Sequence, residues 1–205
     1  METNHTIINI GRQFGSGGRA IAGIIGNILD IPVYDGELLT KAAQESGFSE
    51  DLFRRSDERR RLWGVGSIFG SNRYGSPTSS GLNDAHLFKI QSDVIRNIAD
   101  NGPAIFIGRA SNYVLRDRRC LDVFVCAPMS VRKEFVCSRE GIPADKAEEI
   151  IYKRDKARAE FYNFFTFGHW GKSSDYDLCI DSSVLGYERT AKFIIDFGKE
   201  AGLIG

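Results

Sequence analysis

The chain has 205 residues, of which 42% are hydrophobic and 26% charged, and this composition excludes disordered and low-complexity proteins. Lys plus Arg and Asp plus Glu number 27 each, so no net positive charge exists to attract a nucleic acid polymer or an anionic membrane. No apolar run has the length of a spanning helix or of a signal-peptide core. We therefore expect a single domain over residues 1–205 and a cytoplasmic location.

Cysteine and histidine give no sign of a metal site or a disulfide framework. The cysteines form no CxxC pair, and the three histidines are scattered along the chain. A chain of this length buries its own core without disulfides. We predict that the cysteines are buried free thiols and that no metal is held by protein ligands alone.

Short apolar runs alternate with helical patterns along the sequence. Strands are predicted at 7–10, 31–34, 104–107, 121–127 and 176–180. Helices are predicted at about 21–29, from 38 onward, and at 87–98, 130–139, 143–161 and 187–197. Parallel strands need helical crossovers, so this alternation predicts an α/β fold with three layers, α/β/α, around a mostly parallel five-stranded sheet.

A glycine-rich stretch follows the first predicted strand: Gly11-Arg12-Gln13-Phe14-Gly15-Ser16-Gly17-Gly18-Arg19. Ligands of parallel sheets bind beyond the carboxyl ends of the strands. Glycines there let backbone N–H groups turn toward one point, and the helix that follows adds its positive N-terminal end. The stretch therefore predicts a phosphate-binding loop made by Gly15, Ser16, Gly17 and Gly18.

The loop departs from the Walker A pattern G-x-x-x-x-G-K-[ST]. Gly18 and Arg19 stand where the pattern has its lysine and its hydroxyl residue. Either Arg12 or Arg19 supplies the missing cation, or the cation is absent. Ser16 is the only nearby hydroxyl that could face a magnesium ion.

Three stretches of the chain carry a resemblance to a known family: 7–39, which includes Ile31-Pro32-Val33-Tyr34-Asp35-Gly36-Glu37, then 105–115 and 176–181. Over nearly its whole length the sequence resembles the cytidylate kinase-like family. The resemblance implies the P-loop containing nucleoside triphosphate hydrolase/kinase fold. It also implies that ATP, with Mg²⁺, donates its γ-phosphoryl group to CMP or dCMP. The implied partners are small nucleotides, with no nucleic acid polymer and no membrane; the oligomeric state stays open.

By position, the resemblance implies that Asp35, Lys41 and Arg109 bind the acceptor, within a mobile segment of about 36–85. Gly36, Lys41 and Ala110 replace the serine, arginine and aspartate of the family pattern. Lys41 can pair with a phosphate as a point charge but cannot grip it with two hydrogen bonds as arginine does. An acceptor other than CMP therefore stays open.

Two arginines, Arg154 and Arg158, lie one turn apart on a predicted helix and so share a face. Phosphoryl transfer depends mainly on neutralising charge around the transferred group. The resemblance implies a lid at about 153–173 in which Arg154 and Arg158, together with Arg19, act on that group. The alternative is an ordinary solvated charged helix. We expect the aromatic residues at 161–170 to anchor this segment rather than to stack a base.

The sequence thus predicts an ATP-dependent nucleoside monophosphate kinase. One alternative is a kinase of the same fold that acts on another small acceptor. The other is a non-catalytic, nucleotide-binding regulator, which the missing Walker lysine suggests.

Overall fold

The computed structural model describes residues 5–39 and 81–205, so Lys41 and most of the predicted acceptor segment lie outside the described residues. Its sheet has five parallel strands in the order β2-β3-β1-β4-β5. The strands are β1 (Ile7–Arg12), β2 (Val33–Tyr34), β3 (Ala104–Ile107), β4 (Leu121–Cys126) and β5 (Leu178–Asp181). This architecture confirms the predicted α/β fold with a parallel five-stranded sheet.

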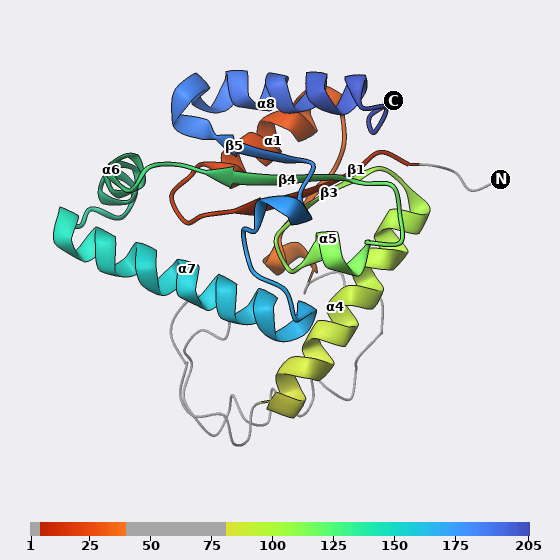
Figure 1. Cartoon of the computed structure of the whole chain (residues 1–205), viewed down its shortest axis with the longest axis horizontal. Helices are drawn as coiled ribbons and strands as arrows, with labels where there is room; N and C mark the ends of the chain where they lie inside the picture. Colours follow the sequence, from red (N-terminus) through yellow and green to blue (C-terminus); the bar gives the residue numbers. More distant parts are fainter. Residues whose placement is uncertain (1–4, 40–80) are drawn as a thin grey trace.

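Helices cover both faces of the sheet (Figure 1). On one face lie α1 (Gly18–Leu29) and α8 (Ser182–Glu200). On the other lie α4 (Gly81–Asn101), α5 (Ser111–Val114) and α7 (Ala144–Thr166), while α6 (Met129–Glu140) packs against α7 at the carboxyl edge. Among the helices of the described ranges, none is long and apolar enough to cross a bilayer.

Both faces of the central strands are apolar because each face is covered. Side chains alternate along a strand, so Ile8 and Ile10 of β1 join the core under α1 and α8. Ile7 points the other way and joins the core under α4 and α5. A third, smaller core lies at the carboxyl edge, where Phe14 packs against α6 and α7. This third core fixes the loop after β1 against the two helices.

Several details differ from the sequence prediction. Helix α7 continues to Thr166, past the predicted end at 161, and stops where Phe167 adopts a left-handed φ of 55°. The short helix α5 was not expected. The prediction of buried cysteines is wrong, because three are half-buried and Cys179, on the edge strand β5, is exposed; all four thiols are free.

Candidate functional site

The loop between β1 and α1, residues 13–17, needs glycine at two positions. Gly15 and Gly17 have left-handed φ values of 83° and 77°, and a Cβ on Gly17 would overlap the ring of Tyr187. Among the described residues, the N–H groups of Gly15, Gly17 and Gly18 have no backbone partner. They lie at the N-terminal end of α1, where helix geometry favours an anion. The loop therefore has the backbone features of a phosphate-binding loop.

Ser16 braces this loop from the inside. Its side chain is 1% exposed, and its hydroxyl lies 2.9 Å from the carbonyl of Gln13 and 3.0 Å from that of Val125 in β4. A hydroxyl has a single proton, so these two carbonyls share it. The hydroxyl proton is thus engaged within the protein.

Arg12, the last residue of β1, extends across the base of the loop. A Cβ on Gly18 would lie 2.7 Å from the Cβ of Arg12, and one on Gly108 would overlap its guanidinium. Burial of this group, together with the charges of Arg158 and Arg109, lowers the pKa of Arg12 to about 9; Asp35 acts in the opposite direction. Arg12 thus remains a cation at neutral pH in a region crowded with like charge.

Arg19 and Asp35 form an ion pair between the start of α1 and the end of β2, with 2.5 Å between Nη2 and Oδ2. The Arg19 side chain is 71% exposed, whereas that of Asp35 is 12% exposed. The other Asp35 oxygen accepts hydrogen bonds from the N–H groups of Glu37 and Leu38, at 3.0 and 3.1 Å. Asp35 therefore caps the helical turn that begins at Gly36 and holds Arg19 at the same time.

Arg109 follows β3 in a strained backbone. Gly108, Arg109 and Ala110 have successive φ values of 70°, 59° and 52°, and the left-handed region costs a non-glycine residue about 1 kcal/mol or more. The guanidinium lies 5.5 Å from the ring centre of Phe161. A Cβ on Gly36 would lie 2.6 Å from Nε of Arg109, so glycine at 36 makes room for this arginine. Arg109 is close enough to Arg12 for its charge to lower the pKa of that guanidinium.

Arg154 and Arg158 lie on α7 and share its face toward the loop. Both guanidiniums are 5.4 Å from the ring centre of Phe14. Arg158 reaches farther in and donates a hydrogen bond of 3.1 Å to the carbonyl of Arg12, and burial lowers its pKa to about 10. Of the predicted lid at 153–173, residues 153–166 belong to the continuous helix α7. A short 3-10 helix at Ser173–Asp175 follows.

The structure therefore gathers four of the predicted site residues, Arg12, Arg19, Arg109 and Arg158, which we call the arginine cluster. Asp35 is the one carboxylate among the described residues that bears on Arg12. Arg154 lies at the rim of the cluster, over Phe14.

Asp155 is a site residue that the sequence analysis did not assign. Its Oδ1 accepts a hydrogen bond of 2.6 Å from the N–H of Phe14, and its Oδ2 lies 2.6 Å from Nη1 of Arg132 in α6. Arg158 is 3.6 Å from the same carboxylate. The carboxylate thus ties the glycine-rich loop to both α6 and α7.

The aromatic residues after Arg158 pack between helices. Phe165 stacks on Phe88 of α4 with 4.2 Å between ring centres, and Phe161 meets both rings edge-on. Trp170 packs edge-on against Phe124 of β4, at 5.4 Å. These contacts hold the end of α7 against α4 and the sheet. Of this group, Phe167 is 92% exposed and takes no part in the packing.

A polar pair, with one residue in β1 and one in β4, interrupts the apolar runs of these two strands. Asn9 of β1, 1% exposed, donates a hydrogen bond of 2.7 Å to Asp122 of β4. Burial raises the pKa of Asp122 to about 6. Both strands were expected to be apolar throughout, so this pair was not predicted.

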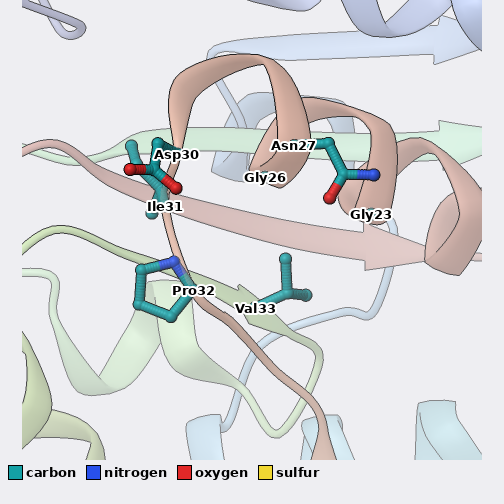
Figure 2. A pocket seen from close by; sticks show the side chains of 7 residues that line it. All are labelled: Gly23, Gly26, Asn27, Asp30, Ile31, Pro32 and Val33. Carbon is teal, nitrogen blue, oxygen red and sulfur yellow. The ribbon is translucent and has the colours of Figure 1, made fainter.

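One hollow of the described residues lies apart from this site. The hollow shown in Figure 2, of about 510 Å³, lies beside the second half of α1 and the start of β2, away from the glycine-rich loop. Asp30 is the only charged residue that lines it. Within residues 5–39 and 81–205, no three His, Cys, Asp or Glu side chains form a group that could hold a metal ion.

A parallel sheet with a glycine-rich loop after its middle strand, and with cationic side chains at the same edge, defines the class of P-loop kinase folds. Comparison with known proteins specifies the family: the chain belongs to the cytidylate kinase-like family, whose model matches residues 7–184.

Individual relatives agree with this membership. A cytidylate kinase from Methanopyrus kandleri is 31% identical over 97 residues, which cover 43% of this chain and only 50% of the relative. The crystal structure of an uncharacterized protein from Eubacterium ventriosum has a TM-score of 0.71 and 25% identity, and covers 93% of this chain and 96% of its own. A shikimate kinase from Bacteroides thetaiotaomicron has a TM-score of 0.52 at 12% identity, covering 96% and 98%, and shows likeness of fold alone.

Proposed function

We propose that this protein transfers a phosphoryl group from ATP to a small phosphorylated acceptor, and that the acceptor is a nucleoside monophosphate, CMP or dCMP before others. The arginine cluster beside the glycine-rich loop carries this proposal. The four guanidiniums have two carboxylates beside them, Asp35 and Asp155, and Asp155 is shared with Arg132, so a local excess of positive charge remains in a protein whose net charge is zero. A polyanion, such as two nucleotides bound side by side, compensates this excess.

The donor phosphates are assigned to the backbone N–H groups of Gly15, Gly17 and Gly18, because these groups lie at the start of α1. Arg19, in the first turn of the same helix, is assigned to the donor as well. The acceptor is assigned to Asp35 and Arg109, which follow β2 and β3, and Lys41 is proposed for the same role on the family pattern alone. Ser16 contributes by holding the loop's shape, because its hydroxyl is engaged with two carbonyls.

Arg154 and Arg158 are assigned to the transferred phosphoryl group. Such a group carries its charge on equatorial oxygens, so fixed cations at this point lower the barrier more than they strengthen ground-state binding. The hydrogen bond from Arg158 to the carbonyl of Arg12, next to the glycine-rich loop, supports this role. The helix that carries both arginines is held to the loop by Asp155.

Magnesium fits the site as an ion held mainly by the phosphates, which is its usual mode in kinases. When bound, it would neutralise part of the phosphate charge. Among the described carboxylates, we assign to Asp35 the orientation of a magnesium-bound water. Its Oδ2 is paired with Arg19, which is a member of the arginine cluster. Contact with the acceptor is the alternative role of this carboxylate.

The acceptor positions that differ from the family pattern bear on the choice of base. Gly36 leaves the space that Arg109 fills, so this arginine approaches where the family has a serine side chain. Ala110 carries no carboxylate that could accept from an amino group of cytosine. Another small acceptor is therefore the alternative that these residues support.

The test is formation of ADP from ATP with Mg²⁺ in the presence of CMP, dCMP, UMP, AMP or no acceptor, with nucleotide-dependent melting recorded on the same samples. We expect ADP formation to depend on a monophosphate and to fall sharply in Arg158→Ala. The control is Lys156→Ala, since Lys156 lies on the same helix with a side chain that is 77% exposed. Stabilisation by ATP without turnover of any acceptor would instead favour the regulator.

A further inference from the structure

Position 18 holds glycine where a Walker loop has its lysine, and the structure indicates why. The Cβ of a side chain at 18 would lie 2.7 Å from the Cβ of Arg12 and 3.0 Å from its Cγ. Real Cβ atoms do not approach one another so closely, so the stem of Arg12 occupies the space through which a lysine at 18 would leave the helix. The two side chains exclude each other.

The guanidinium of Arg12 lies between the two proposed phosphate sites. Its stem passes Gly18, at the donor end, and its Nη1 reaches the place of a Cβ on Gly108, directly before Arg109. Asp35 and Arg109, the residues proposed for the acceptor, are both close enough to act on its charge. A cation in this position faces the gap that a transferred phosphoryl group must cross.

Arg19, the other arginine that could replace the lysine, is placed differently. Its side chain is 71% exposed, and its guanidinium is paired with Asp35 at 2.5 Å. Among the described residues, no ion pair involves Arg12, and the nearby Asp35 is paired with Arg19. Of the two arginines, Arg19 is therefore paired with a carboxylate of the described residues, and Arg12 is not.

From this geometry we infer that Arg12 is the catalytic cation of the loop: it contacts the donor phosphates from β1 in place of a lysine on α1. The inference rests on the proposed function, since it takes ATP as the donor. A half-buried cation surrounded by other cations is unfavourable until a polyanion binds, so Arg12 favours the loaded state of the site. The glycine at 18 is then part of the same arrangement, because it makes room for the arginine.

The experiment exchanges the two positions. Arg12→Gly removes the cation and the stem, and Arg12→Gly/Gly18→Lys places a lysine where the Walker pattern has it. Arg19→Ala and Arg12→Met are made alongside; the Met variant keeps most of the bulk of the side chain and carries the test if the Gly variant does not fold. Affinities for ATP and for adenosine are measured by calorimetry without any acceptor, and turnover is measured separately.

We expect Arg12→Gly and Arg12→Met to weaken ATP binding about tenfold to a hundredfold, the scale of one charged hydrogen bond, and to leave adenosine binding unchanged. Adding Gly18→Lys should restore ATP binding to within about threefold of the natural protein, and Arg19→Ala should lose less than the Arg12 variants. Unchanged ATP affinity in the Arg12 variants, failure of the lysine to restore it, or a larger loss in Arg19→Ala would each overturn the inference.

The two proposals fail in different ways. If ATP affinity depends on Arg12 as expected but the natural protein turns over no acceptor, then the kinase function and the catalytic role of Arg12 are wrong, and only its contact with the ATP phosphates stands. If the natural protein is an active kinase, and the Arg12→Met variant matches it in both ATP affinity and turnover rate, then the assignment of Arg12 is wrong.

Discussion

Removal of the Asp155 carboxylate is expected to destabilise the protein and to disable the loop at once. The Arg132 side chain is only 8% exposed, its Nε already lacks a partner among the described atoms, and Asp155 is its counter-charge at 2.6 Å. Breaking such a buried pair from one side costs about 3 to 5 kcal/mol. For Asp155→Ala we expect a loss of about 3 kcal/mol, or about 6 to 12 °C in Tm for a chain of this size.

A double variant separates the two roles of this carboxylate. Arg132→Met/Asp155→Leu replaces the ion pair by apolar side chains, and such replacements are often neutral in stability. The variant should recover most of the unfolding free energy but not ATP binding, because the N–H of Phe14 still lacks its acceptor. Denaturant unfolding and ATP titration on the same samples measure both quantities.

The same helix provides the matched control. Lys156 and Glu160 form an exposed pair at 3.9 Å, one turn apart, and Glu160→Ala should cost no more than about 0.5 kcal/mol. The reasoning is refuted if Asp155→Ala loses less than about 1 kcal/mol, or if the double variant binds ATP like the natural protein.

Three further outcomes are expected. Arg154→Ala should lower kcat about a hundredfold while the ATP affinity changes far less, and equal losses in both would contradict its role in the transition state. Gly17→Ala should abolish ATP-induced stabilisation, because φ at this position is 77° and the new Cβ would overlap Tyr187. As its control, Gly23→Ala, which places a Cβ in open space on α1, should raise the free energy of unfolding by about 0.5 to 1 kcal/mol. Folding raises the pKa of Asp122 from 3.8 to about 6, so the folded protein holds this proton more tightly than the unfolded chain does. The free energy of unfolding should therefore fall as the pH rises from about 4 to about 6, by at most about 3 kcal/mol. Urea unfolding at pH 4, 5 and 6 should show this fall relative to Asp122→Asn; parallel profiles would exclude it.

The number of strands, their positions along the chain and the position of the loop follow from local sequence patterns; the order of the strands in the sheet was not predicted. Apolar runs bounded by glycine or charge predicted each strand, and the glycines after β1 predicted where phosphate-binding groups lie. The strand ends shifted by one or two residues, as at β5, which begins at Leu178 and not at 176. Such shifts arise because the last hydrogen bonds of a strand depend on its neighbour, and a single sequence does not contain that neighbour.

The unpredicted parts of the site depend on contacts between distant residues. Asp155 and Phe14 are 141 positions apart, and Asn9 and Asp122 are 113 apart. No local pattern signals these pairs; the only sign of the second was a polar residue within each of two apolar strands. The left-handed backbone at Arg109 and Ala110 was equally hidden, because neither residue type favours it and tertiary contacts must impose it.

The ion pair between Arg19 and Asp35 has a thermodynamic consequence for the two substrates. Arg19 is proposed for the donor and Asp35 for the acceptor, so a donor phosphate that pairs with Arg19 and an acceptor group that donates a hydrogen bond to Asp35 each compete with this contact. The substrate that binds first bears the free energy of rupture, about 0.2 to 1 kcal/mol for a pair this exposed, and the second does not. Linkage makes the effect reciprocal, so each substrate should raise the affinity for the other by the same factor, between about 1.4-fold and fivefold. If the proposed sites are right, the pair favours simultaneous occupation of both sites over occupation of either alone.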